Sequence, residues 1–362
     1  MGTEVREVAG GDSRAAADFL RLPARIYPPR LRVHDAAGEL ALLSGRHPLS
    51  GYLSLRAFVC YDGSEAVGRM ALTRYPDDPT QYLGFFECVD DEAVSGALFG
   101  HAARLGGETG ATSVLGPVDA SFWLRYRLKV SGFDTPPFFS EPVNQPYYLR
   151  LFQAAGYRVC DSYVSNLYPR PPEGYRFPLF DRRIDEFTRR GVELRSPRRR
   201  EWELTMRELH GLLHDLYRDF PVFTPIGYRD FRAVFAGFRL ITDLSMVVMA
   251  HHHGRAVGFL VAMPDYGTRL STGPLPGRVA AFVRGRRRSD RYVLLYLGAR
   301  AEYPGLGSAL TGVVAHRIAR RGAEAVGALI HEGRVTAGYA SGLRRARTEY
   351  VLLRRDLGEE HG

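Results

Sequence analysis

The sequence predicts a mixed α+β protein of two similar halves, each a small mixed sheet flanked by helices. Each half contains a stretch typical of a hairpin of apolar strands, and each contains amphipathic helices. A proline-rich segment, residues 168–175, separates the halves, and its prolines can neither extend a helix nor donate to a strand ladder. We therefore expect two tandem domains, residues 1–170 and 171–362.

In the first half, residues 55–72 are typical of a strand, a tight turn and a second strand. The turn is Asp62-Gly63, a pair that supplies the positive φ that a tight hairpin needs. Residues 90–107 then predict a helix that Gly106 and Gly107 end. Its apolar positions recur at three and four residues: Val94, Ala97, Leu98, Ala102 and Leu105.

The second half begins with a helix predicted over residues 201–220 and continues with another hairpin, residues 244–263, around Gly254. The helix has one apolar stripe: Trp202, Met206, Leu209, Leu213 and Leu216. Both hairpins carry a Val-Gly pair at the same place, Val67-Gly68 and Val257-Gly258. This repetition indicates an internal duplication.

The stretch with the clearest chemistry is a buried strand over residues 292–299, a glycine turn and a helix. The helix is predicted from Leu306, Leu310, Val313, Val314 and Ile318. The turn, Gly305-Leu306-Gly307-Ser308, lets the backbone approach a ligand, and the N-terminus of the helix favours phosphate. A pyrophosphate site is one interpretation, and a helix start with packing glycines is the other.

Arginine dominates the charge of the chain. The formal net charge is +9, and Lys129 is the only lysine, so 48 of the 49 Lys and Arg residues are arginine. Net positive charge favours anionic partners such as nucleic acid or phosphorylated cofactors. Arginine accumulated through genomic base composition would raise the charge without any partner, so both interpretations stay open.

Cysteines and hydropathy narrow the class of protein. The three cysteines are far apart, so neither a disulfide framework nor a CxxC metal site is predicted. No window approaches eighteen apolar residues, and the first twenty contain no signal-peptide pattern, so we expect a cytoplasmic protein without a membrane span.

His251, His252 and His253 would alternate between the faces of a strand, so we expect no metal there.

The second half resembles the acyl-CoA-binding half of the Gcn5-related N-acetyltransferase (GNAT) superfamily. The resemblance rests on the strand, the Gly-x-Gly-Ser-Ala-Leu turn, the helix, a strand ending in Ile330-His331-Glu332, and Tyr339 before a closing strand. The chain also resembles a bacterial group of double-domain proteins from that superfamily, and this resemblance covers the sequence from about Phe19 to Leu357. The segments that carry it are residues 84–99, 110–121, 131–139, 144–158 and 256–267. It implies two tandem GNAT-like domains and acyl-CoA, such as acetyl-CoA, as the donor substrate.

The chain departs from the superfamily pattern at both glycine turns. Glu302 stands where the superfamily usually has Arg or Gln, and Tyr303-Pro304 replaces the usual lead into the turn. In the first half, Glu87, Asp90, Asp91 and Glu92 fill the corresponding junction, where carboxylates oppose a phosphate. We therefore expect a degenerate first domain that does not bind CoA.

The resemblance also implies which residues of the second half bind the donor. Gly305, Leu306, Gly307, Ser308 and Ala309 would hold the pyrophosphate, and the backbone of Leu297, Gly298 and Ala299 would pair with the pantetheine arm. Arg286, Arg287 and Arg288 are candidates for the 3′-phosphate of CoA or for an RNA backbone. The other arginine runs, Arg182 and Arg183 among them, are expected in solvated loops.

Acyl transfer to an amine needs a base for the ammonium proton and an acid for the departing thiolate. His331 and Glu332 end the strand beside the predicted cleft, and either could be the base. Tyr339 lies near the usual position of the superfamily's acid. For the acceptor, the polar and aromatic group Glu141, Asn144, Tyr147 and Tyr148 is predicted to bind substrate, although an ordered loop would also explain it.

These observations favour an N-acyltransferase that moves an acyl group from an acyl-CoA thioester to a small-molecule amine. Two alternatives stay open: an aminoacyltransferase that uses aminoacyl-tRNA, and a non-catalytic binding protein with a decayed cofactor loop. Glu302 and Pro304 favour the alternatives, whereas the Gly305 to Ser308 turn favours acyl-CoA.

Overall fold

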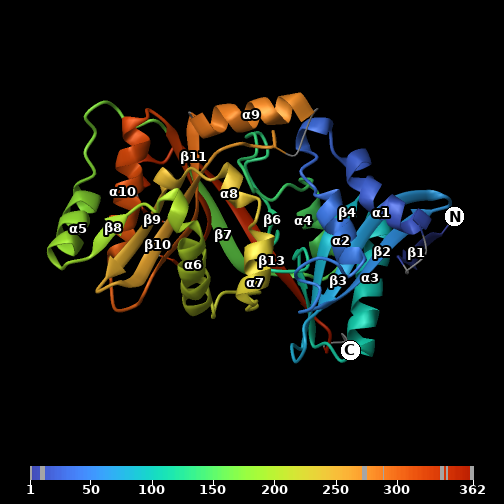
Figure 1. Cartoon of the computed structure of the whole chain (residues 1–362). Helices are drawn as coiled ribbons and strands as arrows, with labels where there is room; N and C mark the ends of the chain where they lie inside the picture. The colour runs from blue at the N-terminus through green and yellow to red at the C-terminus, as the bar shows by residue number, and fades with distance from the viewer. Residues whose placement is uncertain are drawn as a thin grey trace. The chain divides into compact units, whose positions relative to one another are not determined.

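A computed structural model of the chain describes residues 2–8, 13–270, 275–287, 289–334, 338–339 and 341–358, without the side chains at 275, 284, 286, 287 and 341. The chain divides into two compact units (Figure 1). Of the described residues, the first unit contains those within 2–162 and 349–358, and the second contains those within 163–270 and 275–348. The sequence predicted a division at residue 170; the units instead divide within a strand, and the last strand returns to the first unit.

The strands of the first unit follow the order β1-β2-β3-β4-β5-β13, and β6 also pairs with β13. Antiparallel pairs surround one parallel pair, β4 with β5, so the predicted mixed α+β class is confirmed. The elements are β1 (Thr3–Glu7), α1 (Ser13–Ile26), α2 (Ala36–Leu43), β2 (Ser54–Asp62), β3 (Glu65–Arg74), β4 (Thr80–Cys88), α3 (Glu92–Glu108), β5 (Ser113–Gly116), β6 (Leu128–Lys129), α4 (Tyr148–Ala154) and β13 (Ala346–Asp356).

The strands of the second unit follow the order β7-β12-β11-β10-β9-β8, with β11 and β12 parallel. Figure 1 shows α5 and α10 side by side next to the β9–β10 hairpin. The elements are β7 (Arg158–Tyr168), α5 (Pro178–Arg189), β8 (Glu193–Arg195), α6 (Trp202–Leu216), α7 (Tyr228–Val234), α8 (Phe238–Ile241), β9 (Val247–His252), β10 (Arg255–Pro264), α9 (Leu275–Arg287), β11 (Arg291–Ala299), α10 (Leu306–Arg320) and β12 (Glu324–His331).

The two predicted hairpins are β2–β3 and β9–β10, and their glycines have equivalent roles. Gly63 and Gly254 turn the hairpins with φ of +58° and +74°. A Cβ on Gly68 would lie 2.8 Å from Leu98 of α3, and a Cβ on Gly258 would lie 3.0 Å from Leu306 of α10. Each Val-Gly pair therefore lets the helix that follows the first strand after its hairpin pack closely, which supports the predicted duplication.

Alternate residues of the first sheet face two apolar cores. On β2, Phe58 and Cys60 face the core under α3 and α4, whereas Val59 and Tyr61 face the core under α1. Because both faces are covered, these strands are continuous apolar runs rather than apolar-polar alternations. In the second unit the predicted stripe of α10 is buried against β9 and β10, with Leu306, Leu310, Val314 and Ile318 in the core.

Three details differ from the sequence prediction. Helix α3 continues through Gly106 and Gly107 to Glu108, and it ends at the C-cap Thr109 before Gly110, whose φ of +72° is left-handed. Arg182 and Arg183 lie in helix α5 rather than in a loop, because Phe180 and Phe187 bury one face of that helix. Arg286 and Arg287 lie in helix α9, which spans a stretch where the sequence analysis predicted no helix.

The boundary between the two units depends on which strands β13 pairs with. Leu353 pairs with Gly116 of β5, and Val351 pairs with Leu128 of β6, so residues 349–358 complete the first sheet. The proline-rich segment after β7 is irregular, as predicted, but Tyr163 to Tyr168 of β7 already pair with β12. Periodicity identifies a strand but not its partner, which is why the prediction missed this return.

Candidate functional site

The candidate site lies in the second unit, where two parallel strands separate. Strands β11 and β12 pair from Arg291 opposite Glu324 to Leu294 opposite Gly327, and both strands continue after this ladder ends. Just after Leu294, the pairing of β11 with β10 shifts by one residue: Val261 is opposite Tyr296 and Ala262 is opposite Leu294, so Leu295 is skipped. The divergence leaves one edge of β11 beyond Leu294 facing the gap between the strands.

The predicted pantetheine segment, Leu297, Gly298 and Ala299, lies on this part of β11. On its other edge it pairs with β10, where Gly298 is opposite Phe259. The Leu297 carbonyl accepts a hydrogen bond from the Tyr217 hydroxyl at 3.2 Å. Leu297 and Ala299 are only half-buried, so their backbone lies where a ligand strand could pair with it.

The predicted pyrophosphate turn connects β11 to α10. Gly305 is the N-cap of α10 with a φ of +91°, in the left-handed region that favours glycine, and no side chain caps this helix end. Because the turn follows the carboxyl end of β11, the helix N-terminus lies at the end of the strands where they separate. Glu302 and Pro304 are exposed beside it.

Arg183 of α5 supplies a cation at this turn. A Cβ on Gly305 would lie 3.0 Å from Cζ and from Nε of Arg183, and the guanidinium donates to Glu186 at 2.6 Å. A cation beside a helix N-terminus adds to the positive potential that attracts an anion. The sequence analysis placed Arg183 in a solvated loop, although Phe180, Ile184 and Phe187 at helical spacing were a signal for helix α5.

Tyr339 and Ser308 meet over the first turn of α10. Ser308 Oγ donates to the Tyr339 hydroxyl at 3.0 Å, and a Cβ on Gly307 would lie 3.4 Å from the same hydroxyl. Tyr168 donates to the Tyr339 carbonyl at 2.6 Å and fixes the backbone there. The structure therefore brings the predicted acid together with the predicted pyrophosphate residues.

His331 and Glu332 have different surroundings. The His331 ring lies edge-on to Tyr163 and Phe220, with ring centroids 5.2 and 5.7 Å away, and its Nδ1 accepts from the Gly333 amide at 3.3 Å. Glu332 is exposed and forms an ion pair with Arg347. Of these two residues, His331 is half-buried and Glu332 is exposed, and His331 is at the end of β12 where the strands separate.

The predicted phosphate-binding arginines cannot be related to this site. Arg286 and Arg287 lie in α9 with side chains outside the described residues, and Arg288 lies wholly outside them.

The predicted acceptor residues Glu141 and Asn144 lie in the first unit and hold its loops together. Glu141 forms a buried ion pair with Lys129, the single lysine, at 3.0 Å, accepts from the Tyr350 hydroxyl, and accepts from the Phe138 amide at 3.2 Å. Asn144 bonds both backbone groups of Lys129, at 2.7 and 3.0 Å. Through these contacts, Glu141 and Asn144 hold their loop against β6 and β13, which is a structural role.

Replacing Glu141 by Gln should therefore destabilise the first unit. The substitution leaves the Lys129 ammonium buried without its counter-charge, and breaking such a pair costs about 3 kcal/mol. Urea unfolding followed by circular dichroism measures the loss. The double variant Lys129→Met/Glu141→Leu should recover most of the stability, and an unchanged midpoint for Glu141→Gln would contradict the structural role.

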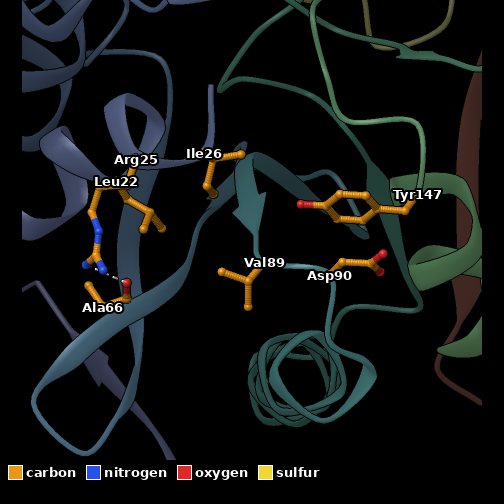
Figure 2. Close-up of a pocket in the computed structure, with 7 residues that line it drawn as sticks. All are labelled: Leu22, Arg25, Ile26, Ala66, Val89, Asp90 and Tyr147. Atoms are coloured by element: carbon orange, nitrogen blue, oxygen red, sulfur yellow. Dashed lines mark hydrogen bonds between the residues drawn. The ribbon is translucent and has the colours of Figure 1, made fainter. Parts of the chain in front are cut away.

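Tyr147 and Tyr148 occupy the edge of β4 in the first unit. Strands β4 and β5 pair only from Thr80 to Tyr82 in their described ladder, so β4 beyond Tyr82 is the counterpart of the gap in the second unit. The Tyr148 hydroxyl accepts from the Cys88 amide at 3.0 Å, and the Tyr147 hydroxyl donates to the Cys88 carbonyl at 2.8 Å. Tyr147 also lines a cavity of this unit (Figure 2).

A loop fills the rest of this edge. The Val118 amide donates to the Leu83 carbonyl at 2.8 Å, and Asp119 Oδ1 accepts from the Phe85 amide at 2.6 Å. Gly84 allows the contact, because a Cβ there would lie 1.9 Å from the Val118 carbonyl oxygen. The chain's own backbone and Asp119 thus bond this edge of β4, whereas on the equivalent edge of β11 the Leu297 carbonyl accepts from the Tyr217 side chain.

The helix end of the first unit is also satisfied internally. Asp91 is the N-cap of α3 and accepts from the Ala93 and Val94 amides at 2.7 and 3.2 Å, and Arg150 forms ion pairs with Asp90 and Glu92. Carboxylates thus occupy this helix N-terminus, in contrast to the uncapped N-terminus of α10.

Metal-ligand groups and membrane helices were sought as well. Across the described ranges, no group of three or more His, Cys, Asp or Glu side chains could hold a metal ion. His251 contacts Glu208 at 3.0 Å, and His252 contacts the Tyr303 hydroxyl at 2.9 Å, so the two rings have separate partners. No helix in the described part of the chain has the length and apolar character needed to cross a bilayer.

Two solved structures of GCN5-related acetyltransferases have the same architecture. A tandem GNAT protein from the clavulanic acid biosynthesis pathway matches with a TM-score of 0.54 and 15% identity over 99% of both chains. A GCN5-related glucosamine N-acetyltransferase region of a fungal multi-domain β-N-acetylglucosaminidase matches with a TM-score of 0.54 and 13% identity over 98% of this chain and 38% of that one. The chain therefore has the tandem GNAT fold, which confirms the predicted resemblance at the level of fold.

Two bacterial proteins are similar in sequence, although no family model matches the chain. Protein YghO of Escherichia coli is 24% identical over 266 residues, which are 70% of this chain and 66% of that protein. A protein of Caulobacter vibrioides named bacterial ceramide synthase is 24% identical over 274 residues, which are 73% of this chain and 70% of that protein. The matches thus span about two thirds of each curated relative.

Proposed function

We propose that this chain, with its tandem GNAT fold, is an N-acyltransferase that moves an acyl group from an acyl-CoA thioester to an amine. The observation that carries the proposal is the separation of β11 from β12 beside the uncapped N-terminus of α10. In the first unit, loop 117–119 and two tyrosines fill the equivalent edge, so the proposal assigns the reaction to the second unit alone.

The residues around the gap fit an acyl-CoA. The edge of β11 that faces the gap offers backbone groups of Leu297 and Ala299 to the pantetheine amides, and the Leu297 carbonyl would share its acceptor oxygen with the Tyr217 hydroxyl. The turn from Gly305 to Ala309 offers a helix N-terminus to the pyrophosphate. Glu302 is unfavourable for a phosphate. The Arg183 guanidinium, which also pairs with Glu186, lies beside Gly305 and offers hydrogen-bond donors at the turn. Bound acyl-CoA supplies an activated thioester.

His331 is the proposed base and Tyr339 the proposed acid. The amine nitrogen attacks the thioester carbonyl carbon, a C–N bond forms, and the C–S bond breaks. The proton lost by nitrogen passes to His331, and the thiolate takes a proton from the Tyr339 hydroxyl. Ser308 donates to Tyr339, so that hydrogen bond does not use the tyrosine's own proton. Glu332 is less suitable as the base because Arg347 holds its carboxylate.

The relative named bacterial ceramide synthase favours an amine acceptor, because a ceramide is an amide of a fatty acid. We therefore include long-chain donors and amino alcohols among the substrates to test. Incubating the full chain with acetyl-, octanoyl- or palmitoyl-CoA and a panel of primary amines should release free thiol and form amides detectable by mass spectrometry. Amide formation from aminoacyl-tRNA but from none of the CoA thioesters would contradict the donor assignment.

Arg183→Ala should weaken acyl-CoA binding about tenfold, because it removes the cation beside the pyrophosphate turn. Arg182→Ala is the matched control, since Arg182 is exposed on the same helix. Calorimetric titration at low salt measures both variants. If Arg183→Ala binds acyl-CoA as tightly as Arg182→Ala does, Arg183 is not part of the donor site.

A further inference from the structure

Helix α9 of the second unit presents two apolar side chains to solvent (Figure 1). Val279 is 52% exposed and Val283 is 41% exposed. The two valines are four residues apart, so they lie on the same side of the helix. Single exposed apolar side chains are ordinary on protein surfaces, so this pair indicates a contact surface only together with a second observation.

The opposite side of α9 packs on its own unit. A Cβ on Gly285 would lie 2.5 Å from the ring of Tyr266, which is itself 1% exposed, so the helix backbone lies close against that ring. The Tyr266 hydroxyl donates to the Ile241 carbonyl at 2.8 Å, which fixes the ring. Gly285 follows Val283 by two residues, and these two positions are on nearly opposite sides of a helix. Val283 therefore lies on the side of α9 that faces away from Tyr266.

The second observation is the charge of the segment that contains α9. Residues 266–289 include six arginines and no Asp or Glu, which gives this segment a formal charge of +6. The arginines are Arg269, Arg278, Arg284, Arg286, Arg287 and Arg288. The two flanking carboxylates have arginine partners outside the segment: Asp265 pairs with Arg291, and Asp290 lies 3.6 Å from Arg170. The excess of positive charge is therefore local to α9 and its neighbouring residues.

The basic positions of α9 border the exposed valines. Arg286 and Arg287 follow Val283 by three and four residues, spacings that place positions on one side of a helix. At the other end of the helix, Arg278 donates to the Leu270 carbonyl at 2.8 Å. The apolar pair and the arginine run after it thus form one surface, which we call the α9 surface.

Two kinds of polyanion are compatible with the charge of the α9 surface. An RNA backbone would use the arginines and would gain nothing from exposed valines. A bilayer that contains anionic phospholipid would use both, because its phosphates attract arginine and its interfacial layer takes up apolar side chains. Val279 and Val283 therefore favour the bilayer.

We propose that α9 binds the surface of a bilayer that contains anionic phospholipid, with Val279 and Val283 in the headgroup layer and the arginines against the phosphates. The contact is peripheral and involves one face of the bilayer. It is independent of the proposed reaction, because binding to a bilayer needs neither a thioester nor an amine.

Flotation of the full-length protein with lipid vesicles tests the proposal. Vesicles of phosphatidylcholine with about 30% phosphatidylserine should bind the protein at least about tenfold more tightly than vesicles of phosphatidylcholine alone. Raising the salt concentration from about 50 to about 300 mM should weaken this binding at least about tenfold, because the screening length shortens.

Two charge variants locate the surface. Arg286→Gln/Arg287→Gln should weaken binding to the phosphatidylserine vesicles at least about tenfold. The matched control is Arg199→Gln/Arg200→Gln, which removes the same charge from two exposed arginines before α6 and should bind within about threefold of the parent.

Two apolar variants separate a bilayer from a nucleic acid. Val279→Ser/Val283→Ser should weaken vesicle binding about fivefold without changing its salt dependence, because the charge is the same. Leu240→Ser is the control, since Leu240 is 62% exposed on α8, and it should leave vesicle binding unchanged. Thermal melts check that each variant folds.

Several results would overturn the proposal, whatever the outcome for acyl transfer. These are no binding to the phosphatidylserine vesicles, equal binding to both kinds of vesicle, an equal loss in the two arginine variants, and full binding by Val279→Ser/Val283→Ser. A gel shift of bulk tRNA that Val279→Ser/Val283→Ser retains, together with no vesicle binding, would assign the α9 surface to nucleic acid instead.

Discussion

His331→Asn is expected to lower the turnover number of acyl transfer by about two to four orders of magnitude, with acyl-CoA affinity unchanged. The substitution removes the group proposed to take the ammonium proton. His331 Nδ1 accepts a hydrogen bond from the Gly333 amide at 3.3 Å, and the asparagine side-chain oxygen can accept the same bond. The end of β12 should therefore keep its conformation. Steady-state kinetics with the best donor and amine, combined with donor titration, separates turnover from binding.

Glu332→Gln is the matched variant for this experiment. Its carboxylate is exposed and paired with Arg347, so we expect a change in turnover of less than about threefold. A large loss in Glu332→Gln with normal turnover in His331→Asn would exchange the two roles. Full activity in both variants would exclude both residues as the base.

Gly307→Glu is expected to abolish acyl-CoA binding. The new carboxylate would stand on the first turn of α10, where the proposal places the pyrophosphate, and would add like-charge repulsion to the loss of close backbone approach. The fold should survive, because the Cβ would lie 3.4 Å from the Tyr339 hydroxyl and a carboxylate is favourable in the first turn of a helix. Calorimetric titration with acyl-CoA measures the loss.

The control for helix content and charge is Gly100→Glu. Gly100 is exposed on α3 of the first unit, and a Cβ there meets no atom within 4 Å. This variant should bind acyl-CoA as the parent does. Unchanged affinity in Gly307→Glu would remove the α10 turn from the donor site and would favour a different anion site.

Local patterns in the sequence were sufficient for much of the fold. Asp62-Gly63 and Gly254 predicted the two hairpins, and the apolar stripe from Leu306 to Ile318 predicted α10, because φ preference and helical period are properties of short segments. Helix α5 was missed, although Phe180, Ile184 and Phe187 have helical spacing, because its arginines were interpreted as a loop. The return of β13 to the first sheet could not be predicted, since pairing over such a sequence separation leaves no local signal.

The sequence by itself determined the fold class, the duplication, and the position of the glycine turn at the end of a buried strand. Tertiary structure decided which groups surround that turn. Arg183 reaches Gly305 only because α5 packs on α10, and Tyr148 occupies the edge of β4 only because α4 follows a long irregular segment back to it. The same strand edge is therefore open in one unit and filled in the other, since side chains distant in sequence compete with a ligand for the same backbone groups.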